Sequence, residues 1–431
     1  MTKSEYQIET KSLHAGQTPD LTTLSRAVPV YKTSSYVFKS TEHAANLFGL
    51  KELGNIYTRL MNPTTDVLEQ RLAQLEGGVG GLAVASGTAA IFYSIVNLAR
   101  VGDRITSAND LYGGTYTQFN NILPDLGINV DFVDPTDPDN YKKAITKDTK
   151  AVYAETIGNP ALNVPDFEAI TEIAHNEGLP FIIDSTFTTP YLLQPIKHGA
   201  DIIAHSLTKW IGGHGTAIGG ALIDGGTFDW ASSKKHPLLT EPNGSYHGLR
   251  FAHDLGDLTP LAYILRARLV PLRNLGGCIS PDNSWIFLQG LETLPLRMKR
   301  HCENAAKVAD HLIEQDQVEW VNYPGLDTHA TYDNAKKYLK KGFGGVVVFG
   351  IKGGAKAGQK FIESLSLFSH LANVGDAKSL AIHPATTTHS QLSEEQQRAG
   401  GITPELVRLS VGLENIDDII GDIDQALKKA K

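Results

Sequence analysis

Cysteine is scarce in this chain of 431 residues, which has only Cys278 and Cys302. Two cysteines without a paired spacing do not indicate a disulfide framework. The histidines form no His-x-x-x-His pair and no Cys-x-x-Cys motif is present, so the sequence offers no zinc site either. We therefore expect the two cysteines to be buried apolar side chains, no bound metal, and a reducing cytoplasmic location.

The chain also lacks an excess of positive charge and a long apolar run. Its 39 lysines and arginines are outnumbered by 47 acidic residues, which gives a net charge of −8. This balance argues against a nucleic-acid partner, because no basic stripe is available to contact phosphates. The most apolar window, 83–99, is interrupted by Gly, Ser, Thr and Asn, and the N-terminus has no signal-peptide pattern. We expect a soluble globular protein without a membrane partner.

The length predicts at least two domains. Residues 1–62 carry few periodic signals and are interpreted as an extended arm. A helix is predicted to begin at Asn62-Pro63, where Asn62 caps and Pro63 occupies the first helical position, and to end at Gly77-Gly78. Short apolar runs then alternate with helical patterns, which predicts a mainly parallel α/β sheet in a large domain, 63–280. A second α/β pattern fills a smaller C-terminal domain, 281–431. The predicted strands are 82–86, 104–108, 128–133, 151–155, 180–184, 201–206, 344–350 and 406–412.

Polar residues stand at the carboxyl ends of the predicted strands of the large domain. Ligands of parallel α/β sheets bind at this edge. The stretch A-H-S-L-T-K-W-I-G-G-H places a lysine there, directly after a buried strand and before several glycines. The residues that collect at this edge are Ser86, Gly87, Thr88, Glu155, Asp184, Ser206, Thr208 and Lys209.

These residue types suit one cofactor. The free amides where a helix opens at Ser86-Gly87-Thr88 bind a phosphate, and hydroxyls of neighbouring residues add donors. A carboxylate at the end of an apolar strand, as at Asp184, needs a cationic or protonated partner. The amine of Lys209, if desolvated, attacks carbonyls. An aldehyde with a phosphate and a ring nitrogen uses all of these groups, and pyridoxal phosphate is that molecule. Tyr112, in D-L-Y-G-G-T-Y, is a candidate to stack on its ring.

Several motifs also carry a family resemblance. The runs A-H-S-L-T-K-W-I-G-G-H, D-S-T-F-T-T-P, E-T-I-G-N-P, Y-T-R-L-M-N-P-T and V-R-L-S-V-G-L-E occur in the order found in the cysteine/methionine-metabolism family of pyridoxal phosphate enzymes. The chain resembles that family from residue 14 to residue 420. The resemblance implies the type I fold of these enzymes, like that of aspartate aminotransferase. This fold has a mainly parallel seven-stranded sheet in the large domain and a smaller C-terminal α/β domain.

The resemblance also implies roles for residues that local patterns leave open. Tyr57 and Arg59 match arm residues that grip the cofactor phosphate of a neighbouring subunit, so we expect a homo-oligomer, at least a dimer and by resemblance a tetramer. Arg408 matches the arginine for the substrate carboxylate, and Asn373 is expected to contact the same group. Asn159 is expected to bind the phenolic oxygen of the cofactor, and Glu155 to orient the arginine that grips the phosphate.

The activity implied is a γ-replacement that joins O-acetylhomoserine to sulfide and yields homocysteine. Lys209 would attach the cofactor and move protons, and Tyr57 or Tyr112 would assist at the leaving group. Alternatives within the family are a methionine or cystathionine γ-lyase and a cystathionine γ-synthase. Gly114 and Asn373 replace the cysteine and serine of the methionine lyases, which favours the synthetic reaction. A non-catalytic phosphate- or nucleotide-binding module is the alternative from another class, but it leaves Lys209 and Asp184 without a role.

The same residues also have simpler interpretations. Tyr57 and Tyr112 are compatible with core aromatics, Asp184 with a turn residue, and Arg408 with an exposed arginine on a strand. The combined pattern around Lys209, and not any single residue, favours the cofactor site.

Overall fold

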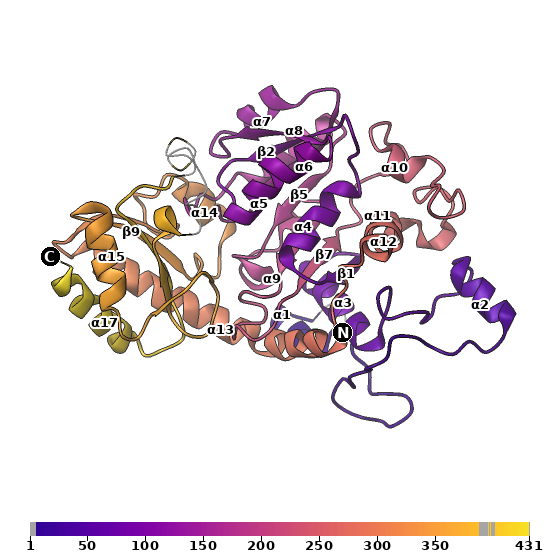
Figure 1. Ribbon diagram of the computed structural model, residues 1–431, viewed down its shortest axis with the longest axis horizontal. Coiled ribbons are helices and arrows are strands. Elements are labelled where there is room, and N and C mark those ends of the chain that lie inside the picture. Colours follow the sequence, from indigo (N-terminus) through magenta and orange to yellow (C-terminus); the bar gives the residue numbers. More distant parts are fainter. Residues whose placement is uncertain (1–5, 388–394, 396, 398–400, 431) are drawn as a thin grey trace.

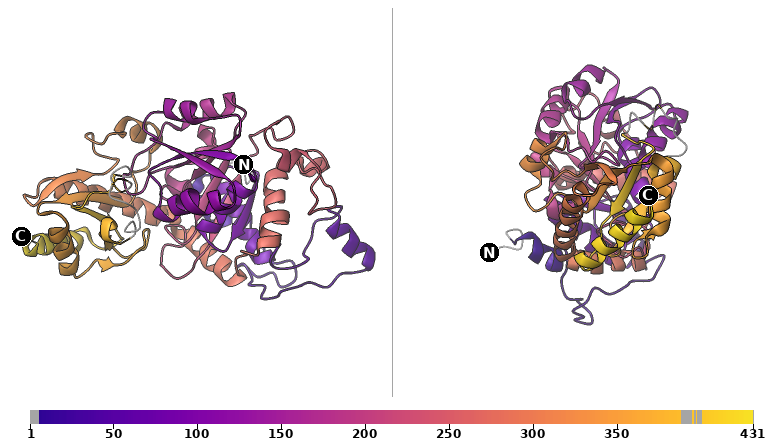
Figure 2. Two further views of the ribbon diagram at one scale, coloured as in Figure 1. Left: turned by 45° about the horizontal axis from the view of Figure 1, so that its top comes forward. Right: turned by 90° about the vertical axis from the view of Figure 1, so that its left-hand side faces the viewer.

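The structure is a computed structural model that describes residues 6–387, 395, 397 and 401–430. Its strands form two separate sheets, one of seven strands and one of five. Figure 1 shows the seven-stranded sheet in the middle of the molecule and the five-stranded sheet at one end. The arm around α2 (Thr41–Phe48) extends at the other end, as Figure 2 also shows. The predicted α/β class and the seven-stranded sheet are confirmed.

The seven-stranded sheet is mainly parallel. Strands β2 to β6 run parallel to one another, whereas β7 is antiparallel to both β1 and β6. The sequence predictions missed β7, whose segment G-A-L-I-D follows a glycine-rich stretch. The order across the sheet is β1 (Gly80–Val84), β7 (Gly220–Asp224), β6 (Ile202–Ser206), β5 (Phe181–Asp184), β4 (Thr149–Glu155), β2 (Arg104–Ala108) and β3 (Asn129–Val133).

Helices cover both faces of this sheet. Consecutive residues of a strand point to opposite faces. A Cβ at Gly80 would meet Ile264 of α11, whereas one at Gly81 would meet the backbone of Glu69 in α3. Because both faces are covered, the inner strands are largely buried: every residue of β5 and β7 is buried, whereas β3 at the edge of the sheet is only partly so. The helices of this part are α3 (Pro63–Glu76), α4 (Gly87–Val96), α5 (Gly113–Thr117), α6 (Leu123–Asp125), α7 (Asp139–Ala144), α8 (Phe167–Asn176), α9 (Thr189–Leu192), α10 (Pro237–Thr240), α11 (Ala262–Ala267) and α12 (Arg273–Leu275).

Helix α3 begins and ends as its sequence predicts. The Asn62 side chain accepts the N–H of Thr64 at 3.0 Å, and Pro63 is the first helical residue. Gly77 ends the helix in the left-handed region, with φ of 85°. The arm before it is less extended than expected, because it contains α1 (Ile8–His14) and α2. Helix α1 packs against α3 and against α13 (Pro281–Ile313), which explains its stability despite its short length. Residues 1–5 of the predicted arm lie outside the described residues.

The five-stranded sheet has its own apolar core. Its order is β10 (Ser369–His370), β11 (Leu380–Ile382), β12 (Leu406–Ser410), β9 (Val346–Ile351) and β8 (Val318–Asn322). The 33-residue helix α13 (Pro281–Ile313) connects the two parts and contacts elements of both. The other helices here are α14 (Tyr332–Tyr338), α15 (Gly354–Ser364) and α17 (Ile416–Lys429). Helix α13 begins at the predicted domain boundary, but the boundaries at 62 and 280 stay predictions. Among the described residues, no helix is long and apolar enough to cross a membrane.

Candidate active site

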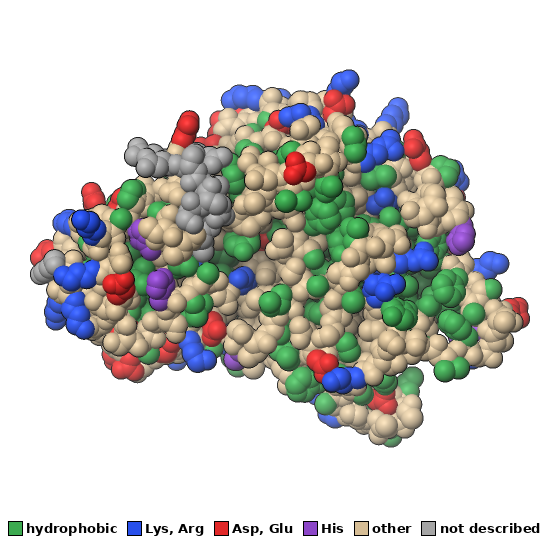
Figure 3. Space-filling model, viewed as in Figure 1, with side chains coloured by type: hydrophobic (Ala, Val, Ile, Leu, Met, Phe, Trp, Pro, Cys, Tyr) green, Lys and Arg blue, Asp and Glu red, His purple; other side chains and the backbone are tan. Residues whose placement is uncertain are grey.

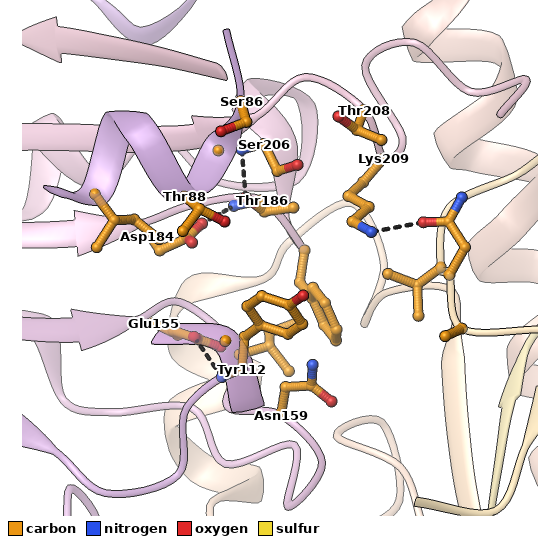
Figure 4. A pocket seen from close by; sticks show the side chains of 18 of the residues that line it. Ser86, Thr88, Tyr112, Glu155, Asn159, Asp184, Thr186, Ser206, Thr208 and Lys209 are labelled. Carbon is orange, nitrogen blue, oxygen red and sulfur yellow. Dashed lines mark hydrogen bonds between the residues drawn. The ribbon is translucent and has the colours of Figure 1, made fainter. Parts of the chain in front are cut away.

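One cavity of about 430 Å³ lies at the carboxyl ends of the parallel strands, and Figure 4 shows its polar lining. The structure brings together here every predicted site residue except Tyr57 and Arg59. The five-stranded part contributes to the same cavity through a loop after β10 and through β12. The predicted residues that line it are Ser86, Gly87, Thr88, Tyr112, Glu155, Asn159, Asp184, Ser206, Thr208, Lys209, Asn373 and Arg408.

The N-terminus of α4 opens on the cavity. The hydroxyl of Ser86 caps this helix by accepting the N–H of Ala89 at 3.1 Å. The N–H groups of Gly87 and Thr88 have no acceptor within the helix, since the first turn leaves its amides unpaired. A Cβ at Gly87 would lie 2.6 Å from the Cβ of Ser206, so α4 and β6 approach this closely only because residue 87 is glycine. A helix N-terminus of this kind binds phosphate.

Thr186 joins the ends of β5 and β6, and sequence reasoning missed it. Its N–H donates to Oδ1 of Asp184 at 2.8 Å, and its hydroxyl accepts the N–H of Ser206, also at 2.8 Å (Figure 4). Burial raises the pKa of Asp184, and the bonds from Thr186 oppose that rise. Asp184 is therefore a buried carboxyl that a cationic partner in the cavity would stabilise. The motif D-S-T contains Thr186, but nothing in it distinguishes this threonine from its neighbours.

Lys209 follows β6 and reaches into the cavity. Its Nζ donates to Oδ1 of Asn373 at 2.6 Å, across to the C-terminal part of the chain. Burial and, to a smaller extent, the charge of Arg408 lower the pKa of Lys209 to about 8, and Asp184 opposes both. An amine with this pKa is partly neutral near neutral pH, which is the form that attacks an aldehyde.

The glycines after Lys209 make room for a buried arginine. Gly213 has a φ of 74°, and a Cβ there would lie 2.2 Å from Nη1 of Arg297. Arg297, on α13, donates to the carbonyl oxygens of Trp210 at 2.6 Å and Ile211 at 3.1 Å. These bonds fix the backbone that follows Lys209, so the lysine projects from a rigid segment. Sequence reasoning missed Arg297, because its partners are carbonyl groups 86 and 87 residues away.

Arg408 lies on β12 and is 5% exposed. Its Nη1 donates to Oδ1 of Asn159 at 3.0 Å, and among the described residues no carboxylate forms an ion pair with it. Burial lowers the pKa of Arg408 to about 10, and the phenol of Tyr112 opposes this. A buried guanidinium with a neutral partner favours an anionic ligand. The amide oxygen of Asn159 is used here, so its amide nitrogen stays available to the cavity (Figure 4).

The backbone of Tyr112 is tied to Glu155. The N–H of Tyr112 donates to Oε1 of Glu155 at 2.8 Å, while the Tyr112 side chain stays 44% exposed. Burial raises the pKa of Glu155, and the neighbouring charge of Asp184 raises it further. In this chain Glu155 therefore holds the loop that carries Tyr112. The predicted role of Glu155 in orienting an arginine stays a prediction.

Tyr57 and Arg59 lie on the arm and do not line the cavity. The guanidinium of Arg59 stands 5.0 Å from the ring centroid of Tyr57, and its Nε donates to the carbonyl oxygen of Arg273 at 3.1 Å. Tyr57 is 39% exposed. Their predicted role in the site of a neighbouring subunit stays a prediction.

The residues present fit pyridoxal phosphate. The glycine at position 87 leaves a helix N-terminus for a phosphate, with hydroxyls beside it. A buried carboxyl and a partly neutral lysine stand in the same cavity. The cavity volume is in the range of small-ligand sites. The chemistry of the donor set thus agrees with a phosphate, a ring nitrogen and an aldehyde.

Comparison with known proteins gives a consistent result. Residues 9–428 match the family described as Cys/Met metabolism PLP-dependent enzymes. An O-acetyl-L-homoserine sulfhydrylase of Leptospira meyeri is 57% identical over 98% of this chain and 97% of its own. A homocysteine synthase of Schizosaccharomyces pombe is 52% identical, over 98% of both chains. A crystal structure assigned as an O-acetylhomoserine (thiol)-lyase of Campylobacter jejuni superposes with a TM-score of 0.94 at 44% identity, over 98% of this chain and 100% of that one. It contains N'-pyridoxyl-lysine-5'-monophosphate.

Proposed function

We propose that this chain, which belongs to the Cys/Met metabolism family of PLP-dependent enzymes, converts O-acetylhomoserine and sulfide into homocysteine and acetate. The observation that carries the proposal is the presence, in one cavity, of a lysine with a pKa of about 8, a buried carboxyl and a buried arginine without a carboxylate partner. The first two serve a PLP cofactor, and the third serves the carboxylate of an amino acid. Two relatives, an O-acetyl-L-homoserine sulfhydrylase and a homocysteine synthase, support the choice of reaction.

The cofactor would be held at three places. The amides of Gly87 and Thr88 and the hydroxyls beside them would bind its phosphate. Asp184 would keep a proton on the ring nitrogen, and Lys209 would attach the aldehyde. When bound, pyridoxal phosphate stores the electron pair that remains after a proton leaves the substrate Cα. The rigid loop behind Lys209 keeps the released amine within reach of that proton.

The side chains then move protons in a defined order. Arg408 and Asn373 would bind the substrate carboxylate, which orients the Cα–H bond toward Lys209. The Lys209 amine would take the Cα proton, release it again, and then take a Cβ proton, because an amine holds one added proton at a time. The Cγ–O bond breaks, and acetate leaves with the electron pair. Hydrosulfide forms the new Cγ–S bond with its own pair, and Lys209 returns protons to Cβ and Cα. The sum is one ester and one hydrosulfide consumed, with one thiol and one acetate formed.

Tyr112 or Tyr57 would assist proton transfer near the leaving group. Tyr112 lines the cavity of its own chain, whereas Tyr57 would act from a neighbouring subunit. The variants Tyr112→Phe and Tyr57→Phe test this assignment by the rate of acetate release. A rate equal to that of the unchanged enzyme in both variants would remove it.

We further propose that each site is shared between subunits, in a homo-oligomer of at least a dimer and by resemblance a tetramer. The arm exposes large apolar side chains, including Leu21, Leu24 and Val37, and Figure 3 shows apolar surface on the side of the molecule where the arm lies. Arg59→Ala and Lys209→Ala would each be inactive. Mixed by reversible dissociation, they would regain activity at about a quarter of the sites in random dimers. Absence of any recovery would contradict the shared site.

A γ-lyase acting on methionine or cystathionine and a cystathionine γ-synthase are the rival functions. Product analysis separates them. The purified enzyme with added cofactor is given O-acetylhomoserine with and without sulfide, O-acetylhomoserine with cysteine, and methionine or cystathionine alone in parallel. Homocysteine formed only with O-acetylhomoserine and sulfide together supports the proposal. Release of ammonia and 2-oxobutyrate from methionine or cystathionine would instead indicate the lyase, and cystathionine formed with cysteine would indicate the synthase.

A protein that stays colourless with added pyridoxal phosphate would favour the non-catalytic phosphate-binding module.

The cytoplasm is the location that we propose, since both cysteines are free.

A further inference from the structure

The ring of Tyr112 occupies the space that a side chain at position 114 would take. A Cβ built on Gly114 would lie 2.5 Å from Cε1, 3.0 Å from Cζ and 3.2 Å from Oη of Tyr112. The first of these distances is much shorter than the 3.5–4 Å of ordinary carbon contact. The φ of Gly114 is outside the left-handed region, so the backbone itself does not require glycine here. A side chain at position 114 therefore requires the ring of Tyr112 to move.

The backbone of Tyr112 is held on both sides of the residue. Its N–H donates to Glu155 at 2.8 Å, and its carbonyl oxygen accepts the N–H of Tyr116 at 2.9 Å. The ring is consequently the part that moves if a side chain is added beneath it. Tyr112 is 44% exposed and lines the cavity, so a displaced ring changes the shape of the space for cofactor and substrate. A displacement of roughly 1 Å restores ordinary contact.

We propose that Gly114 is a positioning residue that acts through Tyr112, and that the missing side chain sets how deeply the Tyr112 ring enters the cavity. The inference rests on the proposed function for its substrate, because the depth of the ring determines the room for an amino acid with a leaving group at Cγ. Its effect on the cofactor is independent of that substrate. A side chain at position 114 changes the site only on the side where the Tyr112 ring lies.

The test compares Gly114→Ala with the same substitution at a second helical glycine. Gly421 lies inside α17 with nothing within 4 Å of an added Cβ, so Gly421→Ala is the control. The dissociation constant of pyridoxal phosphate is measured by its visible absorbance, without substrate, and KM and kcat with O-acetylhomoserine and sulfide. Gly114→Ala is expected to raise the dissociation constant and KM about tenfold, as overpacking does. The thermal midpoint should stay unchanged or rise, because alanine favours the helix more than glycine.

A double-mutant cycle shows whether the effect passes through the ring. In a Tyr112→Ala background, Gly114→Ala should change the dissociation constant less than about twofold. An equal loss in both backgrounds would overturn the proposal, and so would a fall in the thermal midpoint that accompanies the loss of affinity. Unchanged cofactor affinity in Gly114→Ala would overturn it as well. A protein that binds the cofactor as expected but makes no homocysteine would contradict the proposed function and leave the role of Gly114 supported.

Discussion

The low pKa of the Lys209 amine predicts how this residue reacts as the pH is raised. Burial, together with the charge of Arg408, lowers the pKa from 10.5 to about 8. A shift of this size corresponds to about 3 kcal/mol of lost preference for the charged form. At pH 7.5 roughly a quarter of the amine is then neutral, against roughly 0.1% for an ordinary lysine, which is about a 200-fold gain in nucleophile.

Competitive labelling measures this pKa in the protein without cofactor. Trace acetic anhydride modifies neutral amines, and peptide mass spectrometry reports each lysine separately. Lys299, whose side chain is 68% exposed, calibrates the reagent in the same digest. The labelling of Lys209 should rise from pH 6 to pH 9, with a midpoint near 8, and level off above that. Bound pyridoxal phosphate should protect Lys209 and leave Lys299 reactive.

Substitutions of the two neighbouring charges should move the midpoint in opposite directions. Arg408→Met removes a positive charge and should raise the midpoint, although burial keeps it below 10.5. Arg408→Lys retains the charge and should leave the midpoint in place. Asp184→Asn removes the group that stabilises the ammonium and should lower it. A midpoint near 10.5 in the unchanged protein would refute the argument from burial. Equal midpoints in the unchanged protein and Arg408→Met would refute the argument from charge.

Three further substitutions test other parts of the site. Arg408→Lys loses the planar guanidinium, so kcat/KM for O-acetylhomoserine should fall roughly 100-fold, about 3 kcal/mol, while cofactor affinity stays the same. Steady-state kinetics measure kcat/KM, and the visible absorbance of the bound cofactor measures its affinity. His205→Ala breaks a fully buried pair in which Nε2 stands 2.6 Å from Oε1 of Glu76, and should lower the free energy of unfolding by about 3–5 kcal/mol in urea. Gly87→Ala places a methyl group 2.8 Å from the Cα of Ser206, and should weaken pyridoxal phosphate binding at least about tenfold in a titration.

Local patterns predicted the parts of the fold in which neighbouring residues decide the outcome. The cap at Asn62, the stop at Gly77 and the strand ending at Asp184 need only short-range signals, and all three are as expected. The missed β7 shows the limit, because its apolar residues Ala221, Leu222 and Ile223 follow a glycine-rich stretch with no strand-like alternation. The helices α1 and α2 were missed because each has only two turns and the arm shows no long periodic pattern.

The site was predicted in so far as it stands at strand ends. Lys209 and Asp184 were found by that argument alone, whereas Arg408 and Asn373 required the resemblance to a family. Arg408 and Asn373 come from the five-stranded sheet and a loop beside it. No spacing in the sequence predicts that these two residues approach the strand ends of the other sheet. Thr186 and Arg297 were not found at all. Both act through bonds to backbone groups, and such bonds leave no characteristic residue pattern.

The two cations of the cavity are both held by neutral amides. Lys209 donates to Asn373, and Arg408 donates to Asn159, although the carboxyl of Asp184 lines the same cavity. A carboxylate in either position would add the attraction of opposite charges to the hydrogen bond, so it would hold its cation more firmly. An amide oxygen satisfies the buried donor without neutralising its charge. The amine thus stays free to become neutral, and the guanidinium stays free to bind a carboxylate. These two requirements favour asparagine at both positions.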